Sequence, residues 1–342
     1  MLHKDCYTLS EIKSQHKSFA FLSNKKDDIG EITKRVFCNK PEQVIFTGCG
    51  SSYYVAAAVY SHFIQQLDIY ACFLPCFELE LNRSAYIGKK KTLIIPFSRS
   101  SKTTEVVSAI TKCREYTNVT TLAITCDENS SKYNDEIIFC PETEEQSVVM
   151  TKSVTSMIYA GLLVIDALSK MNSIKITESI NTISDFTLQT EIRIRMLAKS
   201  LVDYKLMVGL GQGRYFSMAG ESGIKIKEMC LIPTETYYTL EYRHGPISIA
   251  DEKTLCMLYT SNETSKEDLN ILKELKKLNS FLVCVGESVL DAIKDISDAY
   301  FEIPSGCFPA TIIPAQFLGA YWALEKGLNP DTPRNLMKAV IL

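Results

Sequence analysis

The stretch KTLIIPFSRSSKTTEVV, residues 91–107, predicts a buried strand, a turn rich in Ser and Thr, and then a helix. A second stretch with the same pattern, KTLCMLYTSNETSKEDL, lies 162 residues later at 253–269. Upstream of each, VIFTGCGSS (44–52) matches MVGLGQGRY (207–215) at a spacing of 163 residues. Because nearly the same spacing recurs at separate places, the sequence indicates an internal duplication.

Each half alternates short apolar segments with longer helical ones. Strands rich in Ile, Val and Leu are typical of parallel sheets that are covered on both faces, and the alternation predicts an α/β fold with right-handed crossovers. We expect strands near 43–47, 92–97, 120–125, 136–140, 205–210, 254–259, 280–285 and 299–303. We expect helices near 52–66, 103–117, 151–170, 217–230, 265–278 and 314–326.

The same pattern predicts two tandem domains with three further segments around them. The expected divisions are an N-terminal helical segment (1–34), a first domain (35–175), a linking helix (176–200), a second domain (201–328) and a C-terminal tail (329–342).

Composition excludes several classes of protein. The 342 residues are 46% hydrophobic and 23% charged, with a formal net charge of −3, so we expect neither nucleic acid nor a membrane surface as a partner. The first residues lack the apolar core of a signal peptide, and the longest nearly apolar run, 158–168, is too short to span a bilayer. The twelve Cys form no CxxC pair and do not cluster with the four His, which predicts no metal and free thiols in a reducing cytoplasm.

Two polar turns in the first half follow strands of the predicted sheet. Gly48-Cys49-Gly50-Ser51-Ser52 comes after the first strand, and 98–103 (SRSSKT) comes after the next. Ligands of parallel sheets bind beyond the carboxyl ends of the strands, where helix N-termini and hydroxyl groups favour anions. These turns predict one phosphate site, in the first half; the alternative is that the Ser and Thr residues only cap helices.

The helix predicted after Gly213 carries a second signal. Glu221, Lys225 and Glu228 share one helix face, and His244 follows in the turn YRHGP (242–246). A carboxylate and a histidine can move a proton between carbon and oxygen. The alternatives are a surface ion-pair ladder and a turn histidine. In the tail, an activated Lys338 could form a Schiff base with a sugar carbonyl, although a tail lysine is normally solvated.

Together these motifs resemble the SIS (sugar isomerase) proteins that have two such domains. The similar proteins are the isomerase part of glutamine–fructose-6-phosphate aminotransferase and its stand-alone relatives, the glucosamine-6-phosphate deaminases and fructosamine-6-phosphate deglycases. The resemblance covers about residues 35–342, and its most specific pieces are GESGIKIKE (220–228), His244-Gly245-Pro246 and PRNL (333–336). It implies two tandem SIS domains, each a flavodoxin-like parallel sheet flanked by helices, and no cofactor.

The resemblance also implies roles for individual residues. It implies that Glu228 is the base for proton transfer between C1 and C2, that His244 opens the sugar ring, in some members from the partner subunit, and that Lys338 is the Schiff-base lysine. The loop Glu145–Lys152, including Val148, would line the site. The implied phosphate and hydroxyl contacts are Ser51, Ser52, Ser98, Arg99, Ser100 and Thr103, with Glu221 and Lys225 as polar positions on the catalytic helix.

The chain departs from the family pattern in three respects. Ser101 and Lys102 stand where the family often has Gly and an acidic residue, and Met150 stands where the aminotransferases have Ser. No glutaminase domain is recognisable, and Cys6 is not an N-terminal nucleophile, so we expect no release of ammonia from glutamine.

The resemblance therefore implies a phosphosugar isomerase-type enzyme. Its expected substrate is an amino-sugar 6-phosphate such as glucosamine 6-phosphate, deaminated or isomerised by C1–C2 proton transfer. Two alternatives stay open: a fructosamine 6-phosphate deglycase, and a sugar-phosphate sensor without catalysis. The family also implies a homodimer or homotetramer.

Overall fold

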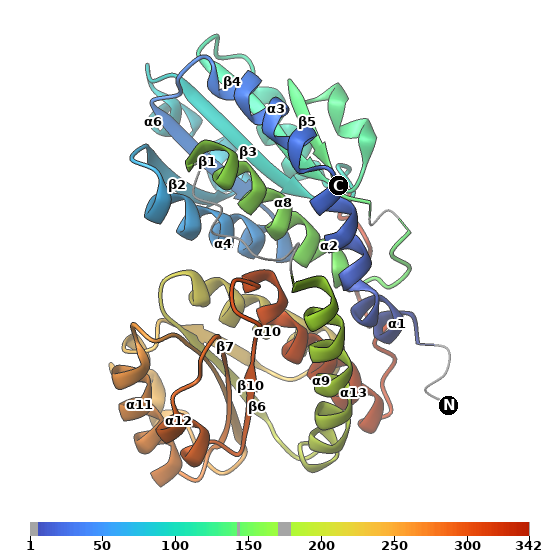
Figure 1. Ribbon diagram of the computed structural model, residues 1–342, viewed down its shortest axis with the longest axis vertical. Coiled ribbons are helices and arrows are strands. Elements are labelled where there is room, and N and C mark those ends of the chain that lie inside the picture. Colours follow the sequence, from blue (N-terminus) through green and yellow to red (C-terminus); the bar gives the residue numbers. More distant parts are fainter. Residues whose placement is uncertain (1–5, 142–143, 170–178, 342) are drawn as a thin grey trace. The chain divides into compact units, whose positions relative to one another are not determined.

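The computed structural model describes residues 6–141, 144–169 and 179–341, and these residues form two units (Figure 1). Parts of the predicted segments lie outside the described residues. These are 1–5 of the N-terminal segment, 142–143 and 170–175 of the first domain, 176–178 of the linking helix and 342 of the tail. The predicted domain boundaries stay predictions. The first-sheet unit contains 17–141, 144–145, 152–169 and 337–341, and the second-sheet unit contains 6–16, 146–151 and 179–336.

The first-sheet unit has five parallel strands in the order β2-β1-β3-β4-β5. This is the flavodoxin-like order. The central strands β1 and β3 are buried along their whole length, because apolar side chains point to both covered faces. The strands are β1 (Gln43–Gly48), β2 (Tyr70–Pro75), β3 (Thr92–Ser98), β4 (Val119–Thr125) and β5 (Glu136–Phe139).

Helices form two layers around this sheet. In one layer α8 packs against α3 and α4, and in the other α5 packs against α7. The division between the two units falls within α2 (Gln15–Asn24). The other helices of this unit are α3 (Lys26–Phe37), α4 (Ser51–Gln66), α5 (Cys76–Leu81), α6 (Arg83–Ile87), α7 (Thr104–Cys113), η2 (Glu128–Lys132) and α8 (Lys152–Ser169).

The helix α8 has 18 residues and is, within the described residues, the one helix long and apolar enough to cross a membrane by length and composition. In the structure 78% of it is buried inside the protein. A core helix meets the same criteria, so α8 is weak evidence for a membrane span.

The second-sheet unit repeats the same topology. Its parallel order, β10-β9-β8-β6-β7, is the first order read from the other edge. The register repeats too, since Gln43 lies opposite Thr92 in the first sheet and Leu206 lies opposite Thr254 in the second. The strands are β6 (Leu206–Gly211), β7 (Thr234–Tyr237), β8 (Thr254–Thr260), β9 (Phe281–Gly286) and β10 (Ala299–Glu302).

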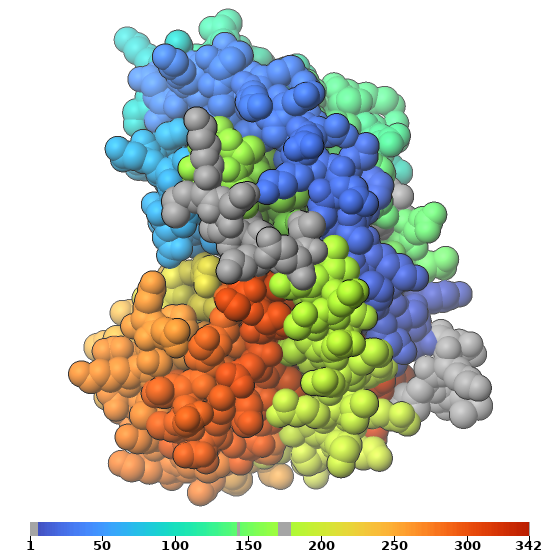
Figure 2. Space-filling view, in the orientation of Figure 1, coloured from blue at the N-terminus to red at the C-terminus, as the bar shows by residue number. Residues whose placement is uncertain are grey.

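In this unit α13 packs against α9 and α10, while α11 packs against α12. Helix α9 lies on the surface of the unit (yellow-green in Figure 2) and exposes Leu188, Ile192 and Met196. The helices are α1 (Tyr7–Lys13), α9 (Ile180–Ser200), α10 (Arg214–Cys230), η4 (Glu241–Arg243), η5 (Pro246–Ile249), α11 (Ser265–Lys277), α12 (Asp291–Ile296), η6 (Phe308–Ile312) and α13 (Ile313–Glu325).

The predicted α/β class with two parallel, helix-flanked sheets is confirmed. Two strands, β2 and β7, were missed. Both are edge strands. Strand β2 begins and ends with exposed residues, and β7 consists of four half-buried residues. Their apolar signal is therefore weaker than that of the central strands.

Candidate functional site

The turn after β1 brings its backbone close to the first residues of α4. A Cβ on Gly48 would collide with the backbone carbonyl of Ser52, and Gly50 has φ +57°, which favours glycine. Ser51 and Ser52 begin α4 and are 6% and 5% exposed. The turn thus places two small hydroxyl groups at the N-terminus of a 16-residue helix, a position that favours an anion.

The turn after β3 is organised by its own hydroxyl groups. The backbone N–H of Ser101 donates to Ser98 Oγ at 3.0 Å, and the Lys102 N–H donates to Ser100 Oγ at 3.2 Å. Ser101, which stands where the family often has Gly, adopts φ +52°, and its hydroxyl bonds Thr125 Oγ1 at 2.7 Å. A non-glycine residue therefore holds a left-handed conformation through a buried hydrogen bond.

Arg99 and Lys338 are brought together by Glu145 in the first-sheet unit. Arg99 Nη1 lies 3.0 Å from Glu145 Oε2, and the two side chains are 10% and 0% exposed. Lys338 Nζ donates to the Glu145 carbonyl oxygen at 2.8 Å, and Arg99 Nη2 donates to the Lys338 carbonyl oxygen at 3.0 Å. The Ser153 hydroxyl also donates to Glu145 Oε2, at 2.7 Å. The C-terminal tail is thus attached to the second predicted phosphate turn.

The same tail reaches the N-terminus of α7, where the Thr104 N–H donates to the Val340 carbonyl oxygen at 3.1 Å. Thr103, an implied phosphate contact, is the N-cap residue of this helix. In this structure one of the N–H groups that a phosphate would use is therefore already hydrogen-bonded to a carbonyl oxygen of the tail.

In the second-sheet unit, the loop 146–151 is held by Glu11 of α1. The Glu11 carboxylate, 5% exposed, accepts hydrogen bonds from the Gln146 N–H, from the Ser147 N–H at 3.1 Å and from the Ser147 hydroxyl. The Val148 N–H donates to the Asp331 carbonyl oxygen at 2.9 Å. The sequence patterns did not predict a role for Glu11. It could have been noticed as an acidic residue on the buried helix face that Leu9 and Ile12 share.

Asp331, at the start of the tail, caps α1. Its carboxylate accepts from the Thr8 N–H and the Thr8 hydroxyl, each at 2.7 Å, and from the Tyr7 N–H at 3.0 Å. An N-terminal helix, the loop 146–151 and the tail are therefore joined by two carboxylates, Glu11 and Asp331.

The helix α10 carries the predicted acid–base cluster. Lys225 Nζ lies 3.0 Å from Glu228 Oε2 and 3.4 Å from Glu221 Oε1. The side chains of Lys225 and Glu221 are 0% and 1% exposed, whereas that of Glu228 is 26% exposed. Burial alone would lower the pKa of Lys225, but the two carboxylates outweigh it and the pKa is raised. Lys225 thus stays cationic beside the one carboxylate of the cluster that reaches solvent.

His244 lies on an exposed turn directly after η4, and its backbone N–H donates to the Glu241 carbonyl oxygen at 3.0 Å. Gly245 follows with φ +117°. The structure therefore groups Glu221, Lys225 and Glu228 on α10 and presents His244 on a separate turn of the same unit. The serine turns, Arg99 and Lys338 belong to the first-sheet unit.

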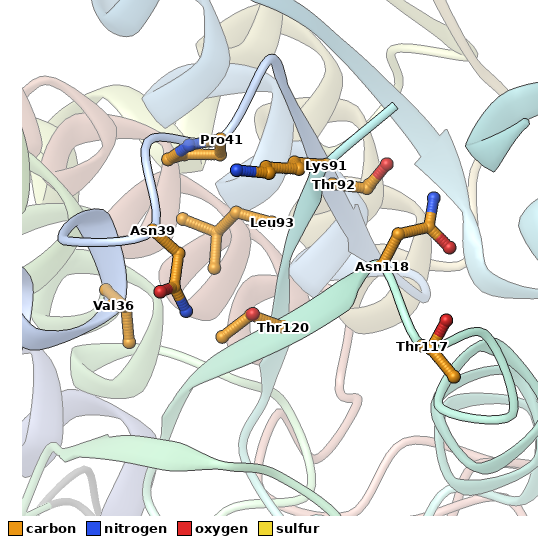
Figure 3. Close-up of a pocket in the computed structure, with 9 residues that line it drawn as sticks. All are labelled: Val36, Asn39, Pro41, Lys91, Thr92, Leu93, Thr117, Asn118 and Thr120. Carbon is orange, nitrogen blue, oxygen red and sulfur yellow. The ribbon is translucent and has the colours of Figure 1, made fainter. Parts of the chain in front are cut away.

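A cavity of about 280 Å³ in the first-sheet unit lies away from these turns (Figure 3). It opens at the amino ends of β3 and β4, opposite the ends that carry the serine turns. Its lining is Val36, Asn39, Pro41, Lys91, Thr92, Leu93, Thr117, Asn118 and Thr120. It is thus separate from the predicted phosphate site.

Part of the chain matches a known domain family. The SIS domain family matches residues 38–168. Over 315 residues the chain is 28% identical to glutamine–fructose-6-phosphate aminotransferase [isomerizing] of Pyrococcus horikoshii, covering 88% of this chain and 52% of that protein. The chain spans about half the length of the curated relatives that it matches.

Solved structures match the whole chain. Glucosamine-6-phosphate deaminase from Thermotoga maritima has a TM-score of 0.79 and 28% identity, covering 98% of this chain and 100% of that one. The C-terminal domain of glucosamine-fructose-6-phosphate aminotransferase from Francisella tularensis has a TM-score of 0.82, at 20% identity, which shows the fold alone. Residues 38–168 therefore match the SIS domain family, and nearly the whole chain is similar to a glucosamine-6-phosphate deaminase. That its second half is also a SIS domain stays a prediction.

Proposed function

We propose that the chain is an enzyme that deaminates or isomerises an amino-sugar 6-phosphate, such as glucosamine 6-phosphate, by proton transfer between C1 and C2. The observation that carries this proposal is the α10 cluster, in which buried Lys225 stands between two carboxylates and only Glu228 is partly exposed. A general base has to reach the proton that it takes, and of the two carboxylates only Glu228 reaches solvent.

In the proposed reaction His244 assists ring opening, and Glu228 takes a proton from one carbon and returns it to the other through an enediol or enolamine. Water then adds to the C2 imine that results, the C–N bond breaks, and ammonia leaves a ketose phosphate. Lys225 acts on Glu228 and does not need to touch the sugar. Lys338 is proposed as a Schiff-base lysine; its hydrogen bond to the Glu145 carbonyl holds it beside the turn that carries Arg99.

The proposed phosphate contacts are the turns at Gly48–Ser52 and 98–103. Support comes from the glycine geometry of the first turn and from the N-termini of α4 and α7, which follow the two turns. The likeness to a glucosamine-6-phosphate deaminase supports the substrate class.

We further propose a cytoplasmic location and a homodimer or homotetramer. All twelve cysteines are free thiols in the structure, which suits a reducing compartment. The apolar helices α8 and α13 are mostly buried.

The test is an assay of ammonia release and amino-acid release from amino-hexose 6-phosphates and fructosamine 6-phosphates. Glu228→Gln should lower kcat for glucosamine 6-phosphate by about 10²- to 10⁴-fold, while calorimetry shows little change in sugar-phosphate affinity. Glu252→Gln, which changes an exposed carboxylate of the same unit, is the control.

A Glu228→Gln variant with the wild-type rate would show that the base is wrong. Release of an amino acid from a fructosamine 6-phosphate, with no ammonia from any amino sugar, would replace the deaminase by the deglycase alternative. Binding without turnover of either substrate would leave the sensor.

A further inference from the structure

Two thiols meet beside the first glycine turn. Cys49 lies between Gly48 and Gly50 and is half-buried, whereas Cys76, the first residue of α5, is fully buried. Gly48 pairs with Pro75 in the parallel register of β1 and β2, so Cys49 and Cys76 directly follow two paired residues. Cys49 also packs against the buried cluster that contains Cys76. The Thr47 hydroxyl in turn donates to Cys76 Sγ at 3.3 Å. The contact is local to the first-sheet unit.

The neighbouring Cys76 favours the thiolate form of Cys49. The hydrogen bond from Cys76 lowers the Cys49 pKa more than burial and the nearby Glu105 raise it. Cys72, a half-buried thiol on β2, differs, because burial raises its pKa. Since the thiolate is the nucleophile, Cys49 is the more reactive of these two thiols of similar exposure.

We propose that Cys49 and Cys76 form a reversible redox pair, in which a peroxide oxidises Cys49 and Cys76 closes the disulfide. An accessible thiolate next to a resolving cysteine is the arrangement found in redox sensors. In a reducing compartment such disulfides are transient and serve sensing or catalysis.

The chemistry balances without any further reactant. The Cys49 thiolate attacks one peroxide oxygen, the O–O bond breaks, and hydroxide leaves to give the sulfenic acid. The Cys76 sulfur loses its proton and attacks the Cys49 sulfur, so that the S–S bond forms and the S–O bond breaks with loss of hydroxide. The two thiols lose two electrons, and the peroxide becomes two molecules of water.

Closure must move the turn. The two sulfurs have to come within about 2.05 Å of each other. Cys49 stands between Gly48, which lies against the backbone of Ser52, and Gly50, which has φ +57°. Ser51 and Ser52 follow directly. Oxidation should therefore alter the backbone that presents these hydroxyl groups, a consequence that does not depend on which substrate the chain binds.

The experiment treats the full-length protein with hydrogen peroxide at pH 7, blocks the remaining thiols with a maleimide, and maps peptides by mass spectrometry. The expected product is a Cys49–Cys76 linked peptide that has lost two hydrogen atoms and disappears on addition of dithiothreitol. Before oxidation, Cys49 should react with the maleimide several-fold faster than Cys72, because a lowered pKa gives more thiolate and a raised pKa gives less.

Two variants separate the pair from general oxidation. In Cys76→Ser the linked peptide should vanish and Cys49 should advance to the sulfinic acid, whereas Cys72→Ser should leave the linked peptide unchanged. Hydrogen exchange of peptides covering 48–54 should change on oxidation of the wild type and not of Cys76→Ser.

Oxidation of the wild type without a linked peptide, or a linked peptide joining Cys49 to another cysteine, would overturn the proposal. A Cys49–Cys76 bond with unchanged exchange at 48–54 would overturn the predicted effect on the turn. Because no readout uses a sugar phosphate, these outcomes are independent of the proposed enzymatic activity.

Discussion

The two glycine turns, Gly48–Ser52 and Gly211–Tyr215, have the same backbone geometry but different side chains. In both, a Cβ on the first glycine would strike the carbonyl of the residue four positions on, and the second glycine has φ +57°. The first turn ends with two buried serines. The second contains Arg214, which lies 3.4 Å from Glu287 and over the Phe308 ring. We therefore expect the repeated scaffold to bind an anion only in the first half.

The turns after β3 and β8 differ in the same sense. In the first half the hydroxyl groups of 98–103 bond within the turn and to Thr125. In the second, Thr260 and Thr264 donate to the buried Asp268 carboxylate at 2.8 and 2.6 Å. A carboxylate already occupies the hydroxyl groups there, so a phosphate would meet a negative charge. The fold therefore determines where an anion can bind, and the side chains determine which half can bind it.

The largest expected effect distinguishes the arginine pairs of the two halves. Glu145→Ala should lower the free energy of unfolding by about 3–5 kcal/mol, because it leaves Arg99 buried without its carboxylate. Glu287→Ala should lower it by about 1 kcal/mol or less, since that pair is part-exposed. Urea unfolding measures both. Equal losses would show that the two pairs have the same role.

The next prediction tests whether the glycine scaffolds are equivalent. Gly48→Ala and Gly211→Ala should each lower stability by about 1–3 kcal/mol, because each new Cβ meets backbone that cannot rotate away. Thermal unfolding followed by circular dichroism gives both values. A large loss in one half and none in the other would break the proposed equivalence.

Asp268 should give the second half a distinct pH dependence. Burial raises its pKa to about 6, although Thr264 and Thr260 oppose the shift. The folded state therefore binds this proton more tightly than the unfolded chain does, and its stabilising contribution is lost as pH rises from about 4 through 6.

Between pH 4.5 and 7 the loss should be about 2 kcal/mol, and Asp268→Asn should remove it. Urea midpoints of the wild type and the variant at several pH values provide the measurement. Parallel curves for the two proteins would mean that Asp268 does not titrate in this range.

The smallest effect concerns phosphate. Ser52→Ala should weaken the binding of inorganic phosphate by about 1 kcal/mol, or several-fold, through loss of one hydrogen bond. Ser261→Ala, in the second-half turn, is the matched control and should leave the affinity unchanged. Calorimetric titration distinguishes them. Equal weakening by both variants would contradict a phosphate site confined to the first half.

Sequence patterns predicted the central strands and the long helices because those segments are apolar and periodic. The edge strands β2 and β7 are only partly buried and lack that signal. The α10 cluster was predicted from helical spacing, since i, i+4 and i+7 positions share a face. Its decisive feature, full burial of Lys225 beside a partly exposed Glu228, depends on tertiary packing.

Contacts between distant segments could not be predicted in the same way. Glu11 binds a loop about 135 residues away, and Asp331 caps a helix 323 residues earlier. Neither contact leaves a local pattern, because the residues that satisfy each carboxylate are set by the fold. The same is true of the thiols Cys49 and Cys76.

The most direct test of the account is proton exchange at the sugar carbons. Wild type and Glu228→Gln are incubated with glucosamine 6-phosphate in D₂O, and deuterium at C1 and C2 of the sugar phosphate is followed by NMR. The account predicts deuterium incorporation with ammonia release for the wild type and neither for Glu228→Gln at equal sugar-phosphate affinity. Wild-type rates of incorporation and ammonia release in Glu228→Gln would contradict it.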